Sequence, residues 1–309
     1  NTKFPFMRFR RVSYPFSAFL SICSVLMFVF WGMNFGIDFA GGTLMELRAK
    51  NGTADIALLR NLAEHLGVGD VGVQAFGTKS DVTLRFGVQP GGDAAQAAAV
   101  DKVKTAVSDG YEIRRVETVG PSVSAELVQS GTLGVVLSIF AVLSYLWFRF
   151  EWQFAVSAVI ATMHDLLLTV GFFSLTQLEF NTTSIAAILT IVGYSLNETV
   201  VVLDRIREMM RKYKKMPTDQ LIDVSINAVL PRTLMTATTV LLALFALVTF
   251  GGQVIRSFSL AMTWGVCVAV YSSIFICSPM MIYLGLRTEG GARSETAGAK
   301  DEAAAEAAR

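Results

Sequence analysis

The sequence predicts an α-helical polytopic membrane protein with six transmembrane helices and one α+β domain between the first two. Hydrophobic residues make up 53% of the 309 residues, and the mean hydropathy of +0.51 is higher than a water-soluble core requires. Six runs are close to, or longer than, the roughly 20 apolar residues that cross a bilayer. A single polar stretch long enough to fold by itself separates the first two runs.

The connection after the first apolar run, residues 36–129, is much longer than the others, the longest of which covers residues 204–227. The six runs cover residues 16–35, 130–148, 152–175, 183–203, 228–250 and 258–284. The first run is longer than the apolar part of a signal peptide and has no small-residue cleavage pattern after it. We therefore expect it to be a retained membrane anchor.

The positions of lysine and arginine predict the orientation in the membrane. Basic residues occur before the first run at 3–11, between the second and third runs at Arg149, and after the fourth run at 205–215. The opposing loops 176–182 and 251–255 contain neither residue type. Since short cytoplasmic loops are enriched in lysine and arginine, both termini are predicted to be cytoplasmic. This rule explains the basic loop better than nucleic-acid binding does.

The expected organisation therefore has five parts. They are a cytoplasmic N-terminus at 1–15, transmembrane helix 1 at 16–35, an extracytoplasmic domain at 36–125, transmembrane helices 2–6 within 126–288, and a cytoplasmic tail at 289–309. The tail is rich in Ala, Gly and Glu, and it has too little apolar bulk for a core. It is predicted to be disordered.

The extracytoplasmic domain has alternating and helical patterns in a clear order. Strand-like segments lie at 42–50, 71–76, 81–88 and 111–120, and helix-like segments lie at 54–67 and 94–110. This β-α-β-β-α-β order predicts a ferredoxin-like fold with an antiparallel sheet. The domain contains no nucleophile–base pair, phosphate-binding loop or metal-type cluster, so a binding or mechanical role is favoured over an enzymatic one.

Glu198 is the charged residue of a membrane run that is otherwise uncharged, residues 183–202. Burying a carboxylate there costs about 2.5 kcal/mol or more, and such residues are candidates for proton handling. Arg232, the only basic residue of the next run, enters from the same side at a similar depth. A salt bridge between them would lower the cost, and a purely structural pair is the alternative. Asn197 and Asp165 add polar groups, which favours proton coupling, although Asp165 could equally pin helices together by a hydrogen bond.

Helical spacing places these residues on small, polar stripes. The stripes are Ala158, Thr162, Asp165 and Thr169; Arg232, Thr236, Thr239 and Ala243; and Thr190, Gly193, Asn197 and Glu198. Such stripes suit close helix packing or a hydrated seam. For Thr236 and Thr239, packing is the favoured interpretation.

Several motifs in the same order cover nearly the whole chain. They are FGIDFAGGTL at 35–44, ETVGPSVSAEL at 117–127, His164-Asp165, IVGYSLNETVVVLDRIRE at 191–208, PRTLMTATT at 231–239, GG at 251–252 and YSS at 271–273. In these motifs the chain resembles the SecF family, whose fold is similar to one half of the resistance-nodulation-division exporters. SecD supplies the other half.

The resemblance implies an accessory subunit of the Sec protein translocase in the bacterial cytoplasmic (inner) membrane. Together with SecD it would use the proton motive force to promote preprotein translocation and release on the outer side, with no cofactor other than the proton gradient. The implied partners are SecD in a SecDF heterodimer, the SecYEG translocon, YajC and YidC as further candidates, unfolded preprotein and the lipid bilayer, and no nucleic acid.

The resemblance also assigns roles to residues. The family's proton-conducting acid and arginine correspond to Glu198 and Arg232, although the family usually has aspartate at the first position. Asp38, Gly41 and Gly42 belong to a family motif that could act as a hinge or form a tight turn. Two other functions stay open, a proton-driven half-size exporter of small molecules or lipids and a passive membrane-protein assembly factor. An exporter of this superfamily usually carries two repeats in one chain.

Overall fold

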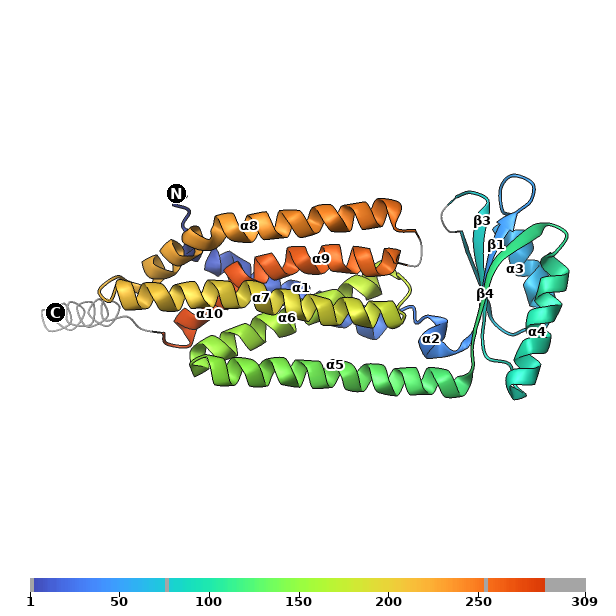
Figure 1. The fold of residues 1–309 in the computed structure, drawn as a ribbon, viewed down its shortest axis with the longest axis horizontal. Coiled ribbons are helices and arrows are strands. Elements are labelled where there is room, and N and C mark those ends of the chain that lie inside the picture. The colour runs from blue at the N-terminus through green and yellow to red at the C-terminus, as the bar shows by residue number, and fades with distance from the viewer. Residues whose placement is uncertain (1–2, 76–77, 253–254, 287–309) are drawn as a thin grey trace, which may run out of the picture.

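The computed structural model describes residues 3–75, 78–252 and 255–286. The molecule is elongated, with a helical bundle at one end and a small α+β domain at the other (Figure 1). We call the end of the bundle remote from the α+β domain the distal end. The predicted disordered tail, residues 289–309, lies outside the described residues.

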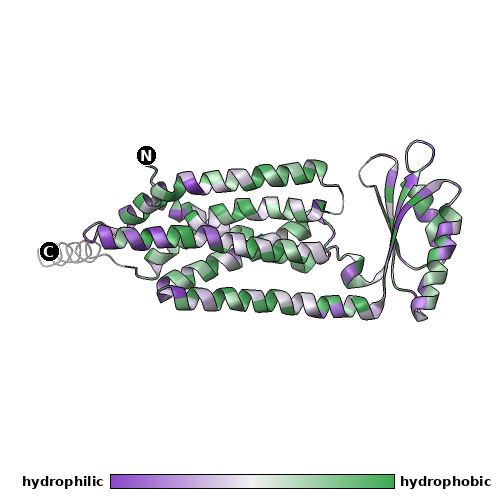
Figure 2. Ribbon diagram, in the orientation of Figure 1, coloured by the Kyte–Doolittle hydropathy of each residue, from purple (hydrophilic) through white to green (hydrophobic). Residues whose placement is uncertain are grey.

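Six helical segments among the described residues are long and apolar enough to cross a membrane, as expected. They consist of η1 (Phe6–Phe9) with α1 (Arg10–Trp31), α5 (Pro121–Arg149), α6 (Trp152–Thr176), α7 (Thr182–Lys212), α8 (Thr218–Phe250), and α9 (Arg256–Ser272) with the π-helix η2 (Ser273–Cys277) and α10 (Ser278–Tyr283). Figure 2 shows hydrophobic residues along these helices and more hydrophilic residues towards the distal end and in the α+β domain.

Burial distinguishes central from peripheral helices. More than half of the apolar window is buried in the α6 and α9 segments, 56% and 61%, against 6% in α5 and 17% in the α1 and α8 segments. In the chain by itself, α5 and α8 therefore present most of their surface outward.

Two boundaries differ from the predicted runs. The first helix ends at Trp31, not at residue 35, because Gly32 has φ 66° and cannot continue a right-handed helix. The fourth helix continues nine residues past the predicted end at Leu203, to Lys212. Its 31 residues measure about 46 Å at 1.5 Å per residue, which exceeds the roughly 30 Å hydrocarbon core. Its last turns therefore project beyond the apolar layer.

The α+β domain has the predicted order of elements. These are β1 (Gly42–Ala49), α3 (Ile56–His65), β2 (Val71–Ala75), β3 (Asp81–Phe86), α4 (Gly92–Val107) and β4 (Tyr111–Val119). The four strands form an antiparallel sheet in the order β2-β3-β1-β4. Helices α3 and α4 cover the face turned away from the bundle (Figure 1).

Alternation along the strands gives this sheet two different faces. Met45 and Leu47 on β1 and Leu84 on β3 are fully buried, and they form a core with residues of α3 and α4. The intervening Glu46 and Arg85 are on the opposite face, towards the bundle. The sheet thus presents polar side chains to the membrane-spanning part.

An ion pair inside the α+β domain leads to a pH-dependent stability. Asp81 accepts hydrogen bonds from Arg48 Nε at 2.7 Å and from Thr78 Oγ1 at 2.6 Å. These partners, Arg48 first, lower the pKa of Asp81 to about 2, against about 3.9 in an unfolded chain. The stabilisation of the folded domain by the charged Asp81 is complete above about pH 4 and is lost as the pH falls through about 2.

We expect the α+β domain to lose stability over this range, and Asp81→Asn to make its stability less dependent on pH. Hydrogen exchange of the β1 and β3 amides, measured in acid for both proteins, tests this. An equally steep pH dependence in the variant would contradict the assignment.

A short segment joins α1 to the α+β domain and contacts the connection between α6 and α7. The backbone N–H of Gly36 donates to Phe180 O at 2.8 Å. After the single turn of α2 (Ile37–Ala40), Gly41 and Gly42 have φ of 71° and 114°. A Cβ at Gly42 would overlap the carbonyl oxygen of Phe86, so glycine is required there for both conformation and space.

Candidate functional site

Glu198 lies in α7 with only 2% of its surface exposed. Its Oε1 accepts a hydrogen bond from Thr236 Oγ1 of α8 at 3.1 Å. Thr236 also donates to backbone carbonyls of its own helix, those of Arg232 and Thr233. Thr236 therefore does more than allow the helices to approach, because its hydroxyl hydrogen-bonds to the buried acid across the helix interface.

Arg232 is on the same stripe of α8, one turn before Thr236, but its side chain is exposed. None of the ion pairs found among the described residues joins it to Glu198. The direct salt bridge expected from the sequence is not formed in this arrangement. The Arg232 side chain is instead exposed in the single chain.

Buried hydroxyls without hydrogen-bond partners lie close to Glu198 in the sequence or on the facing helix. In the part of the chain that the structure describes, they include Thr199 Oγ1 on α7 and Thr233 Oγ1 on α8. Buried polar atoms are normally satisfied by protein groups or ordered water. Hydroxyl groups in this region of the α7–α8 interface can therefore form further hydrogen bonds to water or to another side chain.

Asp165 in α6 forms a second buried polar centre, with 1% of its surface exposed. Its Oδ2 accepts hydrogen bonds from Ser195 of α7 at 2.6 Å and from Ser272 of α9 at 2.8 Å. His164 Nδ1 lies 3.2 Å from its Oδ1. One carboxylate thus ties three helices together, and Ser195 is only three residues from Glu198 on the same helix.

Hydrogen bonds also connect the surroundings of Asp165 to α1. Tyr271, beside Ser272 on α9, shares a hydrogen bond of 2.8 Å with Ser17 Oγ and donates to Ser13 O at 3.3 Å. Since α1 precedes the α+β domain, polar contacts link the buried acid of α6 to the helix that carries this domain. The π-helix η2 follows immediately, a departure from α-helical geometry that is frequent at functional sites.

Asn197 does not share the environment of Glu198. It is exposed, together with Ala186, Thr190 and Gly193 on the same face of α7, whereas Glu198 is turned inward to α8. The predicted arc is therefore divided, since its acid is buried within the chain and its small and polar members face outward.

Asp38 connects the segment containing Gly41 and Gly42 to the bundle. Its Oδ2 accepts from the N–H of Thr182 at 2.9 Å and from Thr182 Oγ1 at 2.5 Å, at the first residue of α7. The segment containing Gly41 and Gly42 is therefore fixed to the helix that carries Glu198, a contact between residues 144 apart.

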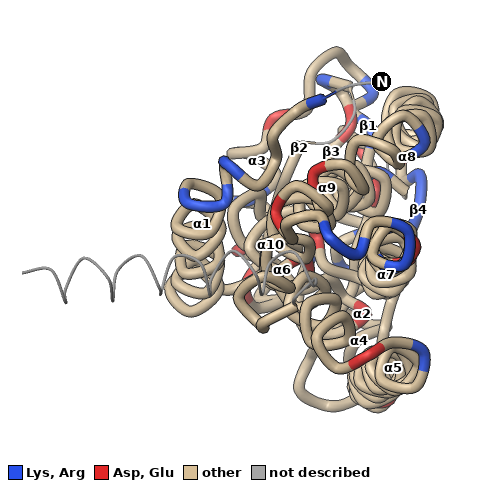
Figure 3. Tube along the Cα trace, turned by 90° about the vertical axis from the view of Figure 1, so that its left-hand side faces the viewer, with Lys and Arg blue, Asp and Glu red and all other residues tan. Residues whose placement is uncertain are grey.

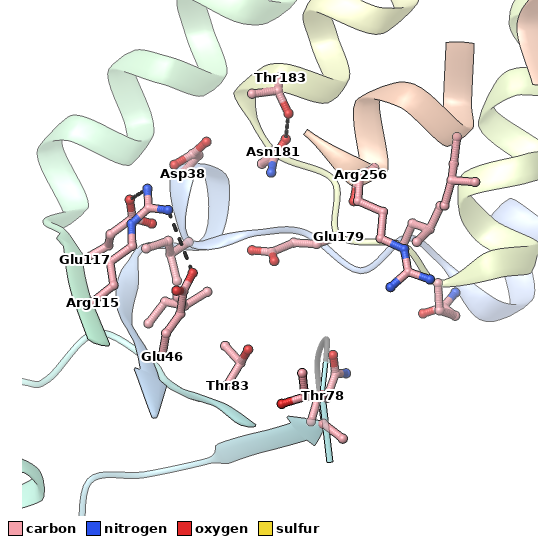
Figure 4. Close-up of a pocket in the computed structure, with 18 of the residues that line it drawn as sticks. Asp38, Glu46, Thr78, Thr83, Arg115, Glu117, Glu179, Asn181, Thr183 and Arg256 are labelled. Atoms are coloured by element: carbon pink, nitrogen blue, oxygen red, sulfur yellow. Dashed lines mark hydrogen bonds and ion pairs between the residues drawn. The ribbon is translucent and has the colours of Figure 1, made fainter. Parts of the chain in front are cut away.

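A polar cavity of about 710 Å³ separates the sheet from the bundle. In Figure 4, Glu179 extends into it, with Arg256 on one side and Arg115 between Glu46 and Glu117 on the other. The Oε1 of Glu179 lies 3.8 Å from Arg85 Nη1, an ion pair between the α6–α7 connection and β3. Burial raises the pKa of Glu179, and the Arg85 guanidinium opposes this.

Family models and similar proteins match this architecture. The model of "Protein export membrane protein SecD/SecF, C-terminal" matches residues 99–287, and the model of the SecD/SecF GG motif matches residues 25–53. The protein translocase subunit SecF of Rickettsia bellii is 43% identical over 282 residues, which cover 90% of this chain and 92% of that protein. The chain belongs to the SecD/SecF family of protein export membrane proteins.

Relatives in this family also occur as fused SecDF chains. SecDF of Brucella abortus is 42% identical over 93% of this chain and 38% of its own length. The crystal structure of SecDF from Thermus thermophilus, described as translocon-associated, superposes with a TM-score of 0.81 at 32% identity, over 93% of this chain and 39% of that one. A second crystal structure, of SecDF in the super-membrane-facing form, superposes on this chain with a TM-score of 0.68. The chain spans about two-fifths of those SecDF chains.

The family models contain all the residues singled out from the sequence. Asp38, Gly41 and Gly42 lie in the GG-motif match, and Asp165 and Glu198 lie in the C-terminal match with their neighbours. The sequence did not indicate the roles of Ser195, Ser272 and Thr182, since serine and threonine are common at helix interfaces. Their partners come from other helices, so spacing within one helix carried no signal for them.

Proposed function

We propose that the chain is an accessory subunit of the bacterial Sec translocase that works with a SecD partner. Together they would use the proton motive force to promote preprotein translocation and release on the outer side of the inner membrane. The proposal places both termini in the cytoplasm and the α+β domain, with its ferredoxin-like order of elements, outside. The basic residues at the distal end support this orientation.

The observation that carries the proposal is the buried carboxyl group of Glu198. It accepts a hydrogen bond from the neutral hydroxyl of Thr236, and no ion pair to it is found among the described residues. Neutral hydroxyl donors do not offset the full cost of a charge at this depth. We infer that Glu198 takes up and releases a proton during the translocation cycle, with Arg232, one turn before Thr236 on α8, as its charged partner.

The proposed coupling runs through two routes to the outer domain. In one, a shift of α7 moves Thr182 and hence Asp38, which accepts two hydrogen bonds from it. In the other, Ser195 transmits the shift to Asp165, and Ser272 and Tyr271 continue it to α1. Protonation would thereby select between two packings of the bundle. The two SecDF structures, with TM-scores of 0.81 and 0.68, support a family that changes conformation.

The proposed SecD partner covers the outward face of α7. This face is made of small or polar residues, Ala186, Thr190, Gly193 and Asn197, all exposed in the chain by itself. Such a stripe allows close approach of another helix and is unsuited to lipid. The fused SecDF relatives, of which this chain spans about two-fifths, supply the matching half. Asn197 would then lie at the subunit interface, and exposed Arg232 near it.

The complex would have further protein partners and would need no bound cofactor. SecYEG, with YajC and YidC, would hold the complex beside the channel, and unfolded preprotein would meet the outer domain. The energy source is the proton gradient, with no bound cofactor. The assembly-factor alternative makes a different prediction for the experiment below.

Arg232→Met tests the proposal, because it removes the charge without shortening the side chain much. We expect preprotein translocation into vesicles containing SecYEG and the SecD partner to lose most of its stimulation by the proton motive force. Translocation driven by ATP alone should persist. Arg60→Met, an exposed arginine of α3, is the matched control. Full stimulation in Arg232→Met at normal protein levels would favour a passive assembly factor.

A further inference from the structure

We propose that the connection between α7 and α8 binds the phosphodiester headgroup of an anionic phospholipid. The site is formed by Arg211, Lys212, Lys214 and Lys215, which we call the distal basic patch. All four are exposed at the distal end of the bundle, and Figure 3 shows basic residues gathered at this end of α7. The inference requires only that the six helices cross a membrane.

The patch concentrates four positive charges that no ion pair among the described residues neutralises. Three arginines at this end do have acidic partners: Arg10 with Asp219 at 3.2 Å, Arg149 with Asp204 at 3.3 Å, and Arg205 with Glu208 at 2.7 Å. Among the ion pairs of the described residues, none includes a residue of the patch. Four like charges within five positions repel one another, so an external anion would stabilise the connection.

The patch also surrounds a hollow of suitable size. A cavity of about 660 Å³ is lined by the patch with Tyr213, Met216, Pro217 and Gln220. The Nζ of Lys212 lies 5.3 Å from the centre of the Tyr213 ring. Tyrosine beside lysine is typical of the headgroup layer, where the ring is amphipathic and the ammonium group reaches phosphate.

The position of the patch favours a membrane lipid over a soluble anion. The ion-paired Asp204 marks the end of the apolar part of α7, and Arg211 lies seven residues further, about 10 Å along the helix. That distance is about one Debye length at physiological salt, so the patch lies within the field of an anionic surface. Both α7 and α8 enter the bilayer from this point, which puts lipid headgroups next to the patch.

The segment before α1, at the same end of the bundle, also carries side chains suited to the membrane interface. Phe4 and Phe9 are 45% and 43% exposed, with their rings stacked 5.5 Å apart. Backbone groups of this segment are held by α8, through Asn227 and Asp223. Exposed aromatic rings fixed at the end of a helical bundle are suited to the interfacial layer, which supports headgroups at this level of the molecule.

The test uses the full chain reconstituted in nanodiscs with equal amounts of phosphatidylglycerol and phosphatidylcholine, and then extracted in mild detergent. Retained lipid is counted by native mass spectrometry. We expect the unmodified chain to retain phosphatidylglycerol preferentially. Lys214→Gln with Lys215→Gln should lower that preference by about five-fold for each lysine removed. Arg60→Gln with Lys102→Gln, exposed residues of α3 and α4, removes the same charge and should leave it unchanged.

Two results would overturn the proposal. One is an equal preference for phosphatidylglycerol in the lysine variant and the unmodified chain, with both eluting as monodisperse folded protein. The other is displacement of the lipid by millimolar glycerol phosphate, which would identify a site for soluble phosphate. High salt should lower the preference in the unmodified chain, because salt screens the electrostatic attraction.

Discussion

Replacing Glu198 with Gln is expected to abolish the stimulation of preprotein translocation by the proton motive force, a loss of ten-fold or more in the stimulated component. Glutamine keeps the size of the side chain and can still accept the hydrogen bond from Thr236. It cannot gain or lose a proton, so the proposed switch between two helix packings has no trigger. The measurement is translocation into vesicles with and without an imposed gradient.

Two matched variants separate this effect from damage to the fold. Glu198→Asp keeps a carboxyl group that can gain and lose a proton and should keep most of the stimulation. Glu208→Gln removes an exposed carboxyl group from the same helix, where it pairs with Arg205, and should cost little, because surface pairs contribute about 0–1 kcal/mol. If Glu198→Gln behaved like Glu208→Gln, the acid would have only a structural role.

Replacing Gly171 is expected to have the largest effect on stability. Gly171 lies in α6 against α1, and an added Cβ would be 2.9 Å from the Cα of Ser24 and closer still to its side chain. A backbone atom cannot move aside by changing rotamer, so the two helices must separate. Overpacking of this kind typically costs about 1–3 kcal/mol, and Gly171→Leu should cost more than Gly171→Ala.

Thermal unfolding of the purified protein, followed by size-exclusion chromatography, measures this effect. Gly134→Ala is the control, because a Cβ there meets no atom within 4 Å and alanine favours the helix. It should unfold at an equal or higher temperature. Equal stability of Gly171→Ala and the unmodified protein would show that α1 and α6 are not held as closely as the structure indicates.

The main features of the fold could be predicted from the sequence because they depend on local patterns. Apolar runs located all six membrane helices, and strand and helix periodicity gave the order of elements in the α+β domain. The ends of the helices were less accurate. Gly32 ends α1 because of its backbone conformation, and α7 continues past Leu203 because charged residues still favour helix outside the membrane.

The partners of the buried acids could not be predicted in the same way. Ser195 and Ser272 reach Asp165 across 30 and 107 residues of sequence, and the interhelical contact between Thr236 and Glu198 depends on how two helices are rotated. Arg232 was expected to pair with Glu198 because both occur at a similar depth. Depth follows from position along a span, whereas direction depends on packing against other helices.

Proton movement through the reconstituted complex with its SecD partner tests the role of Glu198 most directly. The complex is placed in vesicles with a pH-sensitive dye inside, a gradient is imposed, and the rate of change in internal pH is measured. The account predicts proton flux for the unmodified chain and for Glu198→Asp, and background flux for Glu198→Gln at the same protein density. A flux through Glu198→Gln equal to that of the unmodified chain would contradict it.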